Sequence, residues 1–211
     1  MDLRHKFPKG LYGILGEAFS LGRSNVETAE IMIAAGIDIL QYREKAHEKD
    51  RGDMLDECSR IARMARDADV PFIVNDFLDI AILSGAHGVH VGQQDLPAGL
   101  IKKRYPELMV GCSTHDPDQV KKAMEDGVDY IGVGPIFSTQ TKKDASAPVG
   151  FPLIEYVAAL KEIPFAVIGG IKRDNIKTVA GHGASTFCLL TDIIGAPDIG
   201  ERIREIRNRL N

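Results

Sequence analysis

Short apolar runs alternate with longer stretches of helical spacing along the whole chain, which predicts a repeating strand-then-helix fold. The apolar runs predict buried strands at Leu11–Leu15, Ile37–Tyr42, Phe72–Val74, Gly88–Val91, Met109–Cys112, Tyr130–Val133, Phe165–Ile168 and Thr186–Leu189. The stretches between them predict helices at Asn25–Ala35, Asp50–Asp67, Phe77–Leu83, Ala98–Tyr105, Pro117–Glu125, Phe151–Leu160, Arg173–Ala180 and Asp198–Arg209.

Several helix starts have recognisable capping residues. Ser24 precedes the first predicted helix and Glu27 follows three residues later, which is the spacing of a capping box. Asp116 precedes Pro117, a favoured pair for the cap and the first helical position. These signals support the helical interpretation of the stretches that follow them.

Four similar segments join a predicted helix to the next strand: Ala35–Asp38, Ser84–His87, Asp126–Asp129 and His182–Ser185. Each has glycine at its second position, where helices commonly stop, and their recurrence indicates a repeating unit. Eight strand-then-helix units favour a parallel sheet with right-handed crossovers, and eight is the number that closes a TIM barrel.

We therefore expect an α/β fold, a single-domain (β/α)8 TIM barrel over residues 1–211, because the length suits one domain and no linker interrupts the chain. The alternative is an open doubly wound sheet. That fold would need a glycine-rich phosphate turn after the first strand, and residues 16–19 contain no GxGxxG motif.

Composition narrows the class of protein. A hydrophobic content of 44% and a charged content of 27% are ordinary for a globular enzyme. The net charge is −4 without a basic block, which argues against a nucleic-acid partner, and no apolar run is long enough to span a membrane. The three cysteines form no CxxC pair, so neither a disulfide framework nor a zinc site is indicated. Together with the lack of an apolar signal core, this favours a cytoplasmic protein.

The segment Gln41–Lys45 ends a predicted strand and offers the first candidate site. Alternate side chains of an extended chain share a face, so Gln41, Arg43 and Lys45 point one way and the two residues between them the other. An amide and two cations on one face suit a polyanion. A solvated strand end is the alternative, and for one isolated strand the two interpretations have about equal weight.

Polar residues recur after the later strands, whose loops open on one face of a barrel. In chain order, the loops contain Asn75 and Asp76, then Gln93, Gln94 and Asp95, then Ser113, Thr114 and His115, then Thr139, Thr141, Lys142, Lys143 and Asp144. The last two loops contain Gly169 and Gly170, and Leu190, Thr191 and Asp192. The loop over residues 134–148 is longer than most such connections, which favours a mobile lid that carries a cation. Gly169 and Gly170 leave backbone N–H groups for a phosphate.

Asp76 and Asp95 each precede a predicted helix, so either alone is better explained as a helix cap. Together, on neighbouring loops, they become a candidate pair of oxygen ligands for Mg²⁺, which prefers one or two carboxylates with substrate phosphates. His115 alone is expected to be structural. His47, His87, His90 and His182 show no ligand spacing and are expected to be structural or solvated.

An ordered set of short motifs resembles the thiamine-phosphate synthase family over nearly the whole chain. The motifs are Gln41–Lys45, Asn75–Asp76, His90–Asp95, Gly111–Ser113, Gly132–Phe137, Thr139–Lys142 and Ile168–Ile171. No single motif is decisive, but the set in this order is specific. Two positions depart from the family pattern: Gly16-Glu17 stands where Thr-Asp is common, and Leu190-Thr191 stands where an aliphatic residue and Ser are usual.

The resemblance implies roles for individual residues. Contacts to the pyrimidine diphosphate are implied for Gln41, Arg43, Lys45, Asn75, Ser113 and Lys142, of which Arg43, Lys45, Ser113 and Lys142 are expected to take part in catalysis. Mg²⁺ ligation is implied for Asp76 and Asp95. Contacts to the thiazole phosphate are implied for Thr139, Gln140, Thr141, Gly170, Leu190 and Thr191.

The resemblance also implies a reaction, in which a pyrimidine diphosphate is joined to a thiazole phosphate and diphosphate is released. It therefore implies that the partners are small-molecule substrates and that the cofactor is Mg²⁺. Whether the thiazole carries a carboxylate, and whether copies of the chain form a homo-oligomer, is left open. A thiazole tautomerase that uses His115 and a regulatory ligand-binding protein are the alternatives. Neither needs a complete set of diphosphate and metal contacts, which this chain has.

Overall fold

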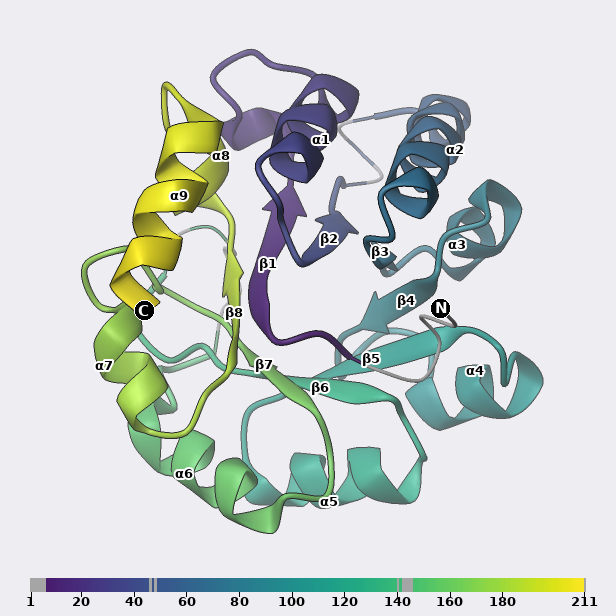
Figure 1. Ribbon diagram of the computed structural model, residues 1–211. Helices are drawn as coiled ribbons and strands as arrows, with labels where there is room; N and C mark the ends of the chain where they lie inside the picture. Colours follow the sequence, from purple (N-terminus) through teal and green to yellow (C-terminus); the bar gives the residue numbers. More distant parts are fainter. Residues whose placement is uncertain (1–6, 46, 48, 140, 142–145, 211) are drawn as a thin grey trace.

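The computed structural model describes residues 7–45, 47, 49–139, 141 and 146–210. Within them, eight parallel strands pair in chain order and the last returns to the first, which closes the barrel and confirms the predicted fold (Figure 1). The strands are β1 (Gly10–Leu15), β2 (Ile39–Tyr42), β3 (Phe72–Asn75), β4 (Gly88–Val91), β5 (Met109–Thr114), β6 (Tyr130–Val133), β7 (Phe165–Val167) and β8 (Thr186–Leu189).

Helices surround the barrel on the outside (Figure 1). They are α1 (Asn25–Ala34), α2 (Arg51–Asp67), α3 (Leu78–Ser84), α4 (Ala98–Arg104), α5 (Pro117–Glu125), α6 (Gly150–Leu160), α7 (Ile176–Gly181), α8 (Thr191–Ile194) and α9 (Ile199–Leu210). A 3-10 turn, η2 (Glu17–Phe19), and α8 were not predicted because elements this short carry no periodicity. None of the described helices has the length and apolar character that a membrane crossing needs.

The predicted start of α7 at Arg173 is wrong by three residues. The side chain of Asn175 accepts the backbone N–H of Lys172 at 2.8 Å, and its own N–H donates to the Lys172 carbonyl at 3.1 Å. These two bonds close a turn before the helix begins at Ile176. The predicted caps are confirmed elsewhere, since Asp116 accepts the N–H of Gln119 at 2.8 Å, and Ser24 likewise caps α1.

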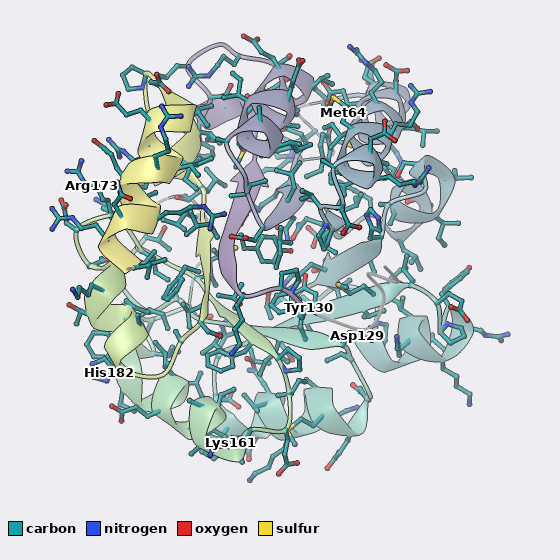
Figure 2. All side chains as sticks on the ribbon, viewed as in Figure 1. Met64, Asp129, Tyr130, Lys161, Arg173 and His182 are labelled. Atoms are coloured by element: carbon teal, nitrogen blue, oxygen red, sulfur yellow. The ribbon has the colours of Figure 1, made fainter. Side chains whose placement is uncertain are left out.

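Two apolar layers follow from the alternation of side chains along each strand. One layer lies between the barrel and the helices. The other fills the barrel interior and consists of Tyr12, Ile14, Ile39, Ile73, Met109, Tyr130, Ala166 and Cys188. Tyr130 lies at the centre of the ring of strands in Figure 2, and its ring stacks on that of Phe7 with centroids 4.3 Å apart.

The four recurring joints between a helix and the next strand share a backbone conformation. Their glycines, Gly36, Gly85, Gly127 and Gly183, all have positive φ, between 69° and 101°, a region that side chains with a Cβ disfavour. In three of these joints the polar residue two positions later accepts a backbone N–H from the preceding strand. The pairs are Asp38 with Leu11 at 2.7 Å, His87 with Phe72 at 3.0 Å, and Asp129 with Val110 at 2.7 Å.

Candidate functional site

A cavity of about 750 Å³ opens at the end of the barrel where the strands finish. The structure brings most of the predicted site residues together on its wall: Gln41, Arg43, Asn75, Asp76, Asp95, Ser113, Thr139, Thr141, Gly170, Leu190 and Thr191. Lys45 is not among the residues that line it. Gln140 and Lys142, with Lys143 and Asp144 of the predicted lid, lie outside the described residues.

The end of β2 presents alternate side chains to the inside and the outside of the barrel, as predicted. Gln41 is 4% exposed and donates from Nε2 to the hydroxyl of Tyr12 at 2.7 Å, inside the barrel. Arg43, two residues on, lines the cavity. Tyr42 and Glu44 face outward and bond to groups outside the barrel, so the two faces of this segment have separate roles.

Glu44 ties the strand end to the neighbouring elements. Its Oε1 accepts the side-chain N–H of Asn25 at 2.8 Å and the backbone N–H of Glu17 at 2.7 Å. Glu17, one of the two departures from the family pattern, therefore belongs to this outer cluster, where its carboxylate pairs with Lys49 at 2.8 Å. These bonds hold the backbone that carries Arg43.

Glu57 on α2 is the second anchor of the outer cluster. It accepts the hydroxyl of Tyr42 at 2.7 Å and the ammonium of Lys49 at 2.6 Å. Burial opposes its ionisation, but the hydrogen bonds from Lys49, Tyr42 and Asn25 outweigh burial and hold the pKa of Glu57 below its usual value. An ionised Glu57 gives the Tyr42 hydroxyl a strong acceptor away from the cavity.

Neither of the two predicted metal ligands caps a helix. The capping position of α3 is Phe77 and that of α4 is Pro97, and neither helix has a side-chain capping bond. Asp95 instead accepts the N–H of Gly92 at 2.7 Å. Asp76 has φ of 63°, in the left-handed region that few residues other than glycine adopt. Asp76 and Asp95 both line the cavity.

The donor set fits Mg²⁺. No group of three or more metal-binding side chains of the His, Cys, Asp or Glu type occurs in the part of the chain that the structure describes. Two carboxylates on one wall, Asp76 and Asp95, suit a cation that takes its remaining oxygen ligands from phosphates and water.

The formal charges of the described cavity wall cancel. Arg43 and Lys172 are positive, and Asp76 and Asp95 are negative. Lys172 was not singled out from the sequence. A wall without net charge holds a polyanion weakly, and a bound divalent cation would make the site positive.

Among the cavity residues that the sequence analysis did not assign to the site are Tyr12, His90 and Tyr130. His90 was expected to be structural or solvated, but its ring lies between the Tyr130 hydroxyl at 3.0 Å and the Ser113 hydroxyl at 2.9 Å. The sequence does contain a signal for the position of His90, because it stands between Val89 and Val91, whose side chains pack in the layer between barrel and helices. A histidine at that position must face the barrel interior.

The strand-seven turn approaches the strand-six loop closely. Gly170 has φ of 65°, and a Cβ placed there would lie 2.7 Å from Cβ of Phe137 and 2.9 Å from the carbonyl oxygen of Ser138. Asn175 donates to the Gly170 carbonyl at 3.0 Å, which holds the turn in place. Leu190 and Thr191 line the same side of the cavity, so this side joins the loops after strands six, seven and eight.

His115 also lines the cavity, and its Nδ1 lies 2.5 Å from the carbonyl oxygen of Gly134. A carbonyl only accepts, so Nδ1 carries the proton of this contact. The backbone N–H of His115 donates to the side chain of Gln119 at 2.9 Å. Both contacts tie His115 to its neighbours on the cavity wall.

The chain is similar to known proteins both in sequence and in structure. The family model described as thiamine monophosphate synthase matches residues 11–193. Thiamine-phosphate synthases of Pelotomaculum thermopropionicum and Lawsonia intracellularis are 48% and 45% identical to the chain, covering 93% and 95% of it and 90% and 92% of their own lengths.

A solved structure, thiamine phosphate pyrophosphorylase from Pyrococcus furiosus, superposes with a TM-score of 0.87 at 26% identity and covers 99% of this chain and 96% of its own. A 3-hexulose-6-phosphate synthase, at 19% identity and a TM-score of 0.65, shares the fold alone. From the matched family model, the curated relatives and the shared barrel, we conclude that the chain belongs to the thiamine-phosphate synthase family, transferases of thiamine biosynthesis.

Proposed function

We propose that the chain condenses 4-amino-2-methyl-5-(diphosphooxymethyl)pyrimidine with 4-methyl-5-(2-phosphooxyethyl)thiazole, or its carboxylated form, to give thiamine monophosphate and diphosphate. The observation that carries the proposal is the single cavity that joins Arg43 and the pair Asp76 and Asp95 to the Gly170 turn. Two anionic substrates need two anion-binding sides, and the cavity has a cation on each, Arg43 after β2 and Lys172 after β7.

The pyrimidine diphosphate is assigned to the side formed by strands two to five. Gln41, Asn75 and Ser113 supply an amide, a second amide and a hydroxyl for the ring, while Arg43 meets the diphosphate. A guanidinium suits this task because it offers several donors in a fixed plane. The roles of Lys45 and Lys142 rest on the resemblance to the family.

The thiazole phosphate is assigned to the opposite side. Thr139 and Thr141 come from the loop after β6, Gly170 from the turn after β7, and Leu190 and Thr191 from the end of β8. The loops after strands seven and eight form the usual phosphate site of this fold. Gln140 belongs to this group by resemblance, and Thr191 keeps the hydroxyl that the family has as Ser.

The proposed reaction is a dissociative displacement. The bond between the methylene carbon and the diphosphate oxygen breaks, and the electron pair leaves with the diphosphate. The thiazole nitrogen then donates its electron pair to the pyrimidinylmethyl cation, which forms the new carbon–nitrogen bond. No protein nucleophile is needed, so the protein contributes by placing both substrates and by stabilising charge on the leaving group through Arg43.

Asp76 and Asp95 would hold Mg²⁺ beside the diphosphate. When bound, the ion neutralises the charge that grows on the departing oxygens. Asp76 follows β3 and Asp95 follows β4, so the pair would place the ion on the side of the cavity assigned to the diphosphate.

The decisive experiment supplies both substrates and Mg²⁺ and measures thiamine monophosphate and diphosphate. We expect equal amounts of the two products. A protein that isomerises the thiazole without consuming the pyrimidine diphosphate would be a tautomerase, and one that binds ligand without turnover would be a regulatory protein. Either result would contradict the proposal.

A further inference from the structure

Five side chains form an unbroken row of hydrogen bonds across the barrel interior. Gln41 Nε2 donates to the Tyr12 hydroxyl at 2.7 Å, which lies 2.9 Å from the Tyr130 hydroxyl. Tyr130 lies 3.0 Å from Nδ1 of His90, and Nε2 of His90 lies 2.9 Å from the Ser113 hydroxyl. We name this row the inner chain. Its two ends, Gln41 and Ser113, are both predicted pyrimidine contacts.

The barrel interior is shaped around the inner chain. A Cβ on Gly111 would lie 2.2 Å from the ring of Tyr130, and a Cβ on Gly132 would lie 3.2 Å from the ring of His90. Both tyrosines are buried, with 1% and 0% of their surfaces exposed. Burial, first of all, raises the pKa of Tyr12 and of Tyr130 well above the usual value, so both hydroxyls keep their protons.

The donor at Gln41 determines the direction of every bond in the inner chain. A buried hydroxyl needs an acceptor for its one proton. The Gln41 amide nitrogen cannot accept, so the Tyr12 hydroxyl donates to the Tyr130 hydroxyl. Tyr130 in turn donates to His90, whose Nδ1 must then be the acceptor. The proton of a neutral imidazole with an accepting Nδ1 is on Nε2.

We propose that the inner chain holds His90 as the neutral tautomer protonated on Nε2 and thereby makes the Ser113 hydroxyl a donor into the cavity. His90 donates to the oxygen of Ser113, so the Ser113 proton points elsewhere. At the other end, Gln41 donates one side-chain N–H to Tyr12, and this bond orients the Gln41 amide. Tyr12, Tyr130 and His90 are thus positioning residues for the two end groups.

The consequence for ligand choice rests on the proposed function. A 4-aminopyrimidine offers an amino donor and ring-nitrogen acceptors, whereas its 4-oxo analogue offers an acceptor and a ring N–H. Groups held in one orientation cannot rearrange to pair with both patterns, and an unpaired buried polar group is costly. The inner chain therefore selects the amino form over the oxo form.

The first test needs no substrate. The free protein is labelled with 15N in its histidines and long-range 1H–15N correlations are recorded near neutral pH. The signals of His90 are identified by their loss in His90→Gln. We expect a protonated Nε2 and an unprotonated Nδ1. A proton on Nδ1, or on both nitrogens, would overturn the proposal whatever reaction the protein catalyses.

Three tyrosine-to-phenylalanine variants test whether the inner chain sets the tautomer of His90. Tyr130→Phe removes the donor to Nδ1 and should shift both His90 ring signals, while Tyr12→Phe, one link further away, should shift them less. Tyr42→Phe is the matched control, because Tyr42 is equally buried but donates outward to Glu57 at 2.7 Å. Equal shifts in all three variants would mean a general effect on packing and would contradict the inner chain.

The second test measures binding of the amino and oxo pyrimidine diphosphates by calorimetry. We expect the parent protein to prefer the amino form about tenfold or more, the scale set by one mispaired buried polar group. Tyr12→Phe frees the Gln41 amide to rotate and should reduce this preference, whereas Tyr42→Phe should leave it unchanged. Binding of neither compound would count against the proposed function alone, since the tautomer of His90 is measured without them.

Discussion

The two ends of the barrel use similar polar residues in opposite ways. At the end where the strands begin, Asp38, His87 and Asp129 each accept a backbone N–H of the preceding strand. At the end where they finish, Asp76 and Asp95 line the cavity. Residues of the same type therefore support the strands at one end and line the proposed metal site at the other.

Ion pairs strengthen this contrast. Asp38 pairs with Arg207 at 2.8 Å, and Asp129 pairs with Lys102 at 2.8 Å, so the protein itself neutralises the two carboxylates at the strand starts. In the cavity, Arg43 and the two aspartates come from loops after different strands. Substitutions at the strand starts should lower stability and spare activity, and substitutions at the cavity should do the reverse.

The largest effect is expected for Arg43→Ala. Loss of a donor to the leaving group should lower kcat by about two orders of magnitude or more, measured by release of diphosphate. The melting temperature should change little, because Arg43 lies on the cavity wall. Arg51→Ala is the control, since Arg51 forms an exposed pair with Asp79 on the surface. Unchanged kinetics in folded Arg43→Ala protein would refute the assignment.

The carboxylate pair should set the Mg²⁺ requirement. EDTA should abolish activity and excess Mg²⁺ should restore it. Asp76→Asn and Asp95→Asn should each raise the Mg²⁺ concentration for half-maximal activity by about tenfold or more, because changes even to groups behind a metal ligand cost that much. Asp79→Asn, at an exposed carboxylate of α3, is the matched control. If all three variants titrate like the parent, these aspartates do not hold the metal.

Asp129→Ala tests the other end of the barrel. It removes the acceptor of the Val110 N–H and the partner of Lys102, which should lower the free energy of unfolding by about 2 kcal/mol, measured by urea denaturation. The kcat of the folded protein should remain that of the parent. Asp118→Ala, at a side chain 93% exposed, should cost less than about 0.5 kcal/mol. Equal losses in the two variants would contradict the role of the joint.

The smallest expected effect is the contribution of His87 to the pH dependence of the protein's stability. Its Nδ1 accepts the Phe72 N–H, and burial followed by the nearby charge of Arg66 lowers its pKa. The unfolded chain, with a histidine pKa of about 6.5, therefore binds the proton more readily than the folded protein. Stability should be complete above about pH 6.5 and fall as the pH decreases below it.

Denaturation curves of the parent and of His87→Gln, measured between about pH 5 and 8, isolate this contribution. The variant should lose stability less steeply on the acid side, because glutamine does not titrate. Parallel profiles would show that His87 does not contribute to the acid sensitivity of the protein.

The alternation of apolar runs and helical stretches was enough to predict the order of the elements, because face and period are local properties of the chain. The motifs at the strand ends likewise predicted most of the cavity wall, since parallel strands of a barrel all finish at one end. The same reasoning placed Lys45 with Gln41 and Arg43, yet Lys45 does not line the cavity. It follows the last residue of β2, Tyr42, by three positions, where strand alternation no longer applies.

Only the tertiary structure decided which inward-facing residues meet. Tyr12 and Tyr130 are 118 positions apart, and Tyr130 and His90 are 40 apart. Strand periodicity indicates that each faces the interior, but not which side chain it reaches there. Which side chains come into contact depends on the closure of the sheet and on the space left by Gly111 and Gly132. The inner chain, which joins two predicted contacts through three unpredicted residues, therefore exists only in the folded barrel.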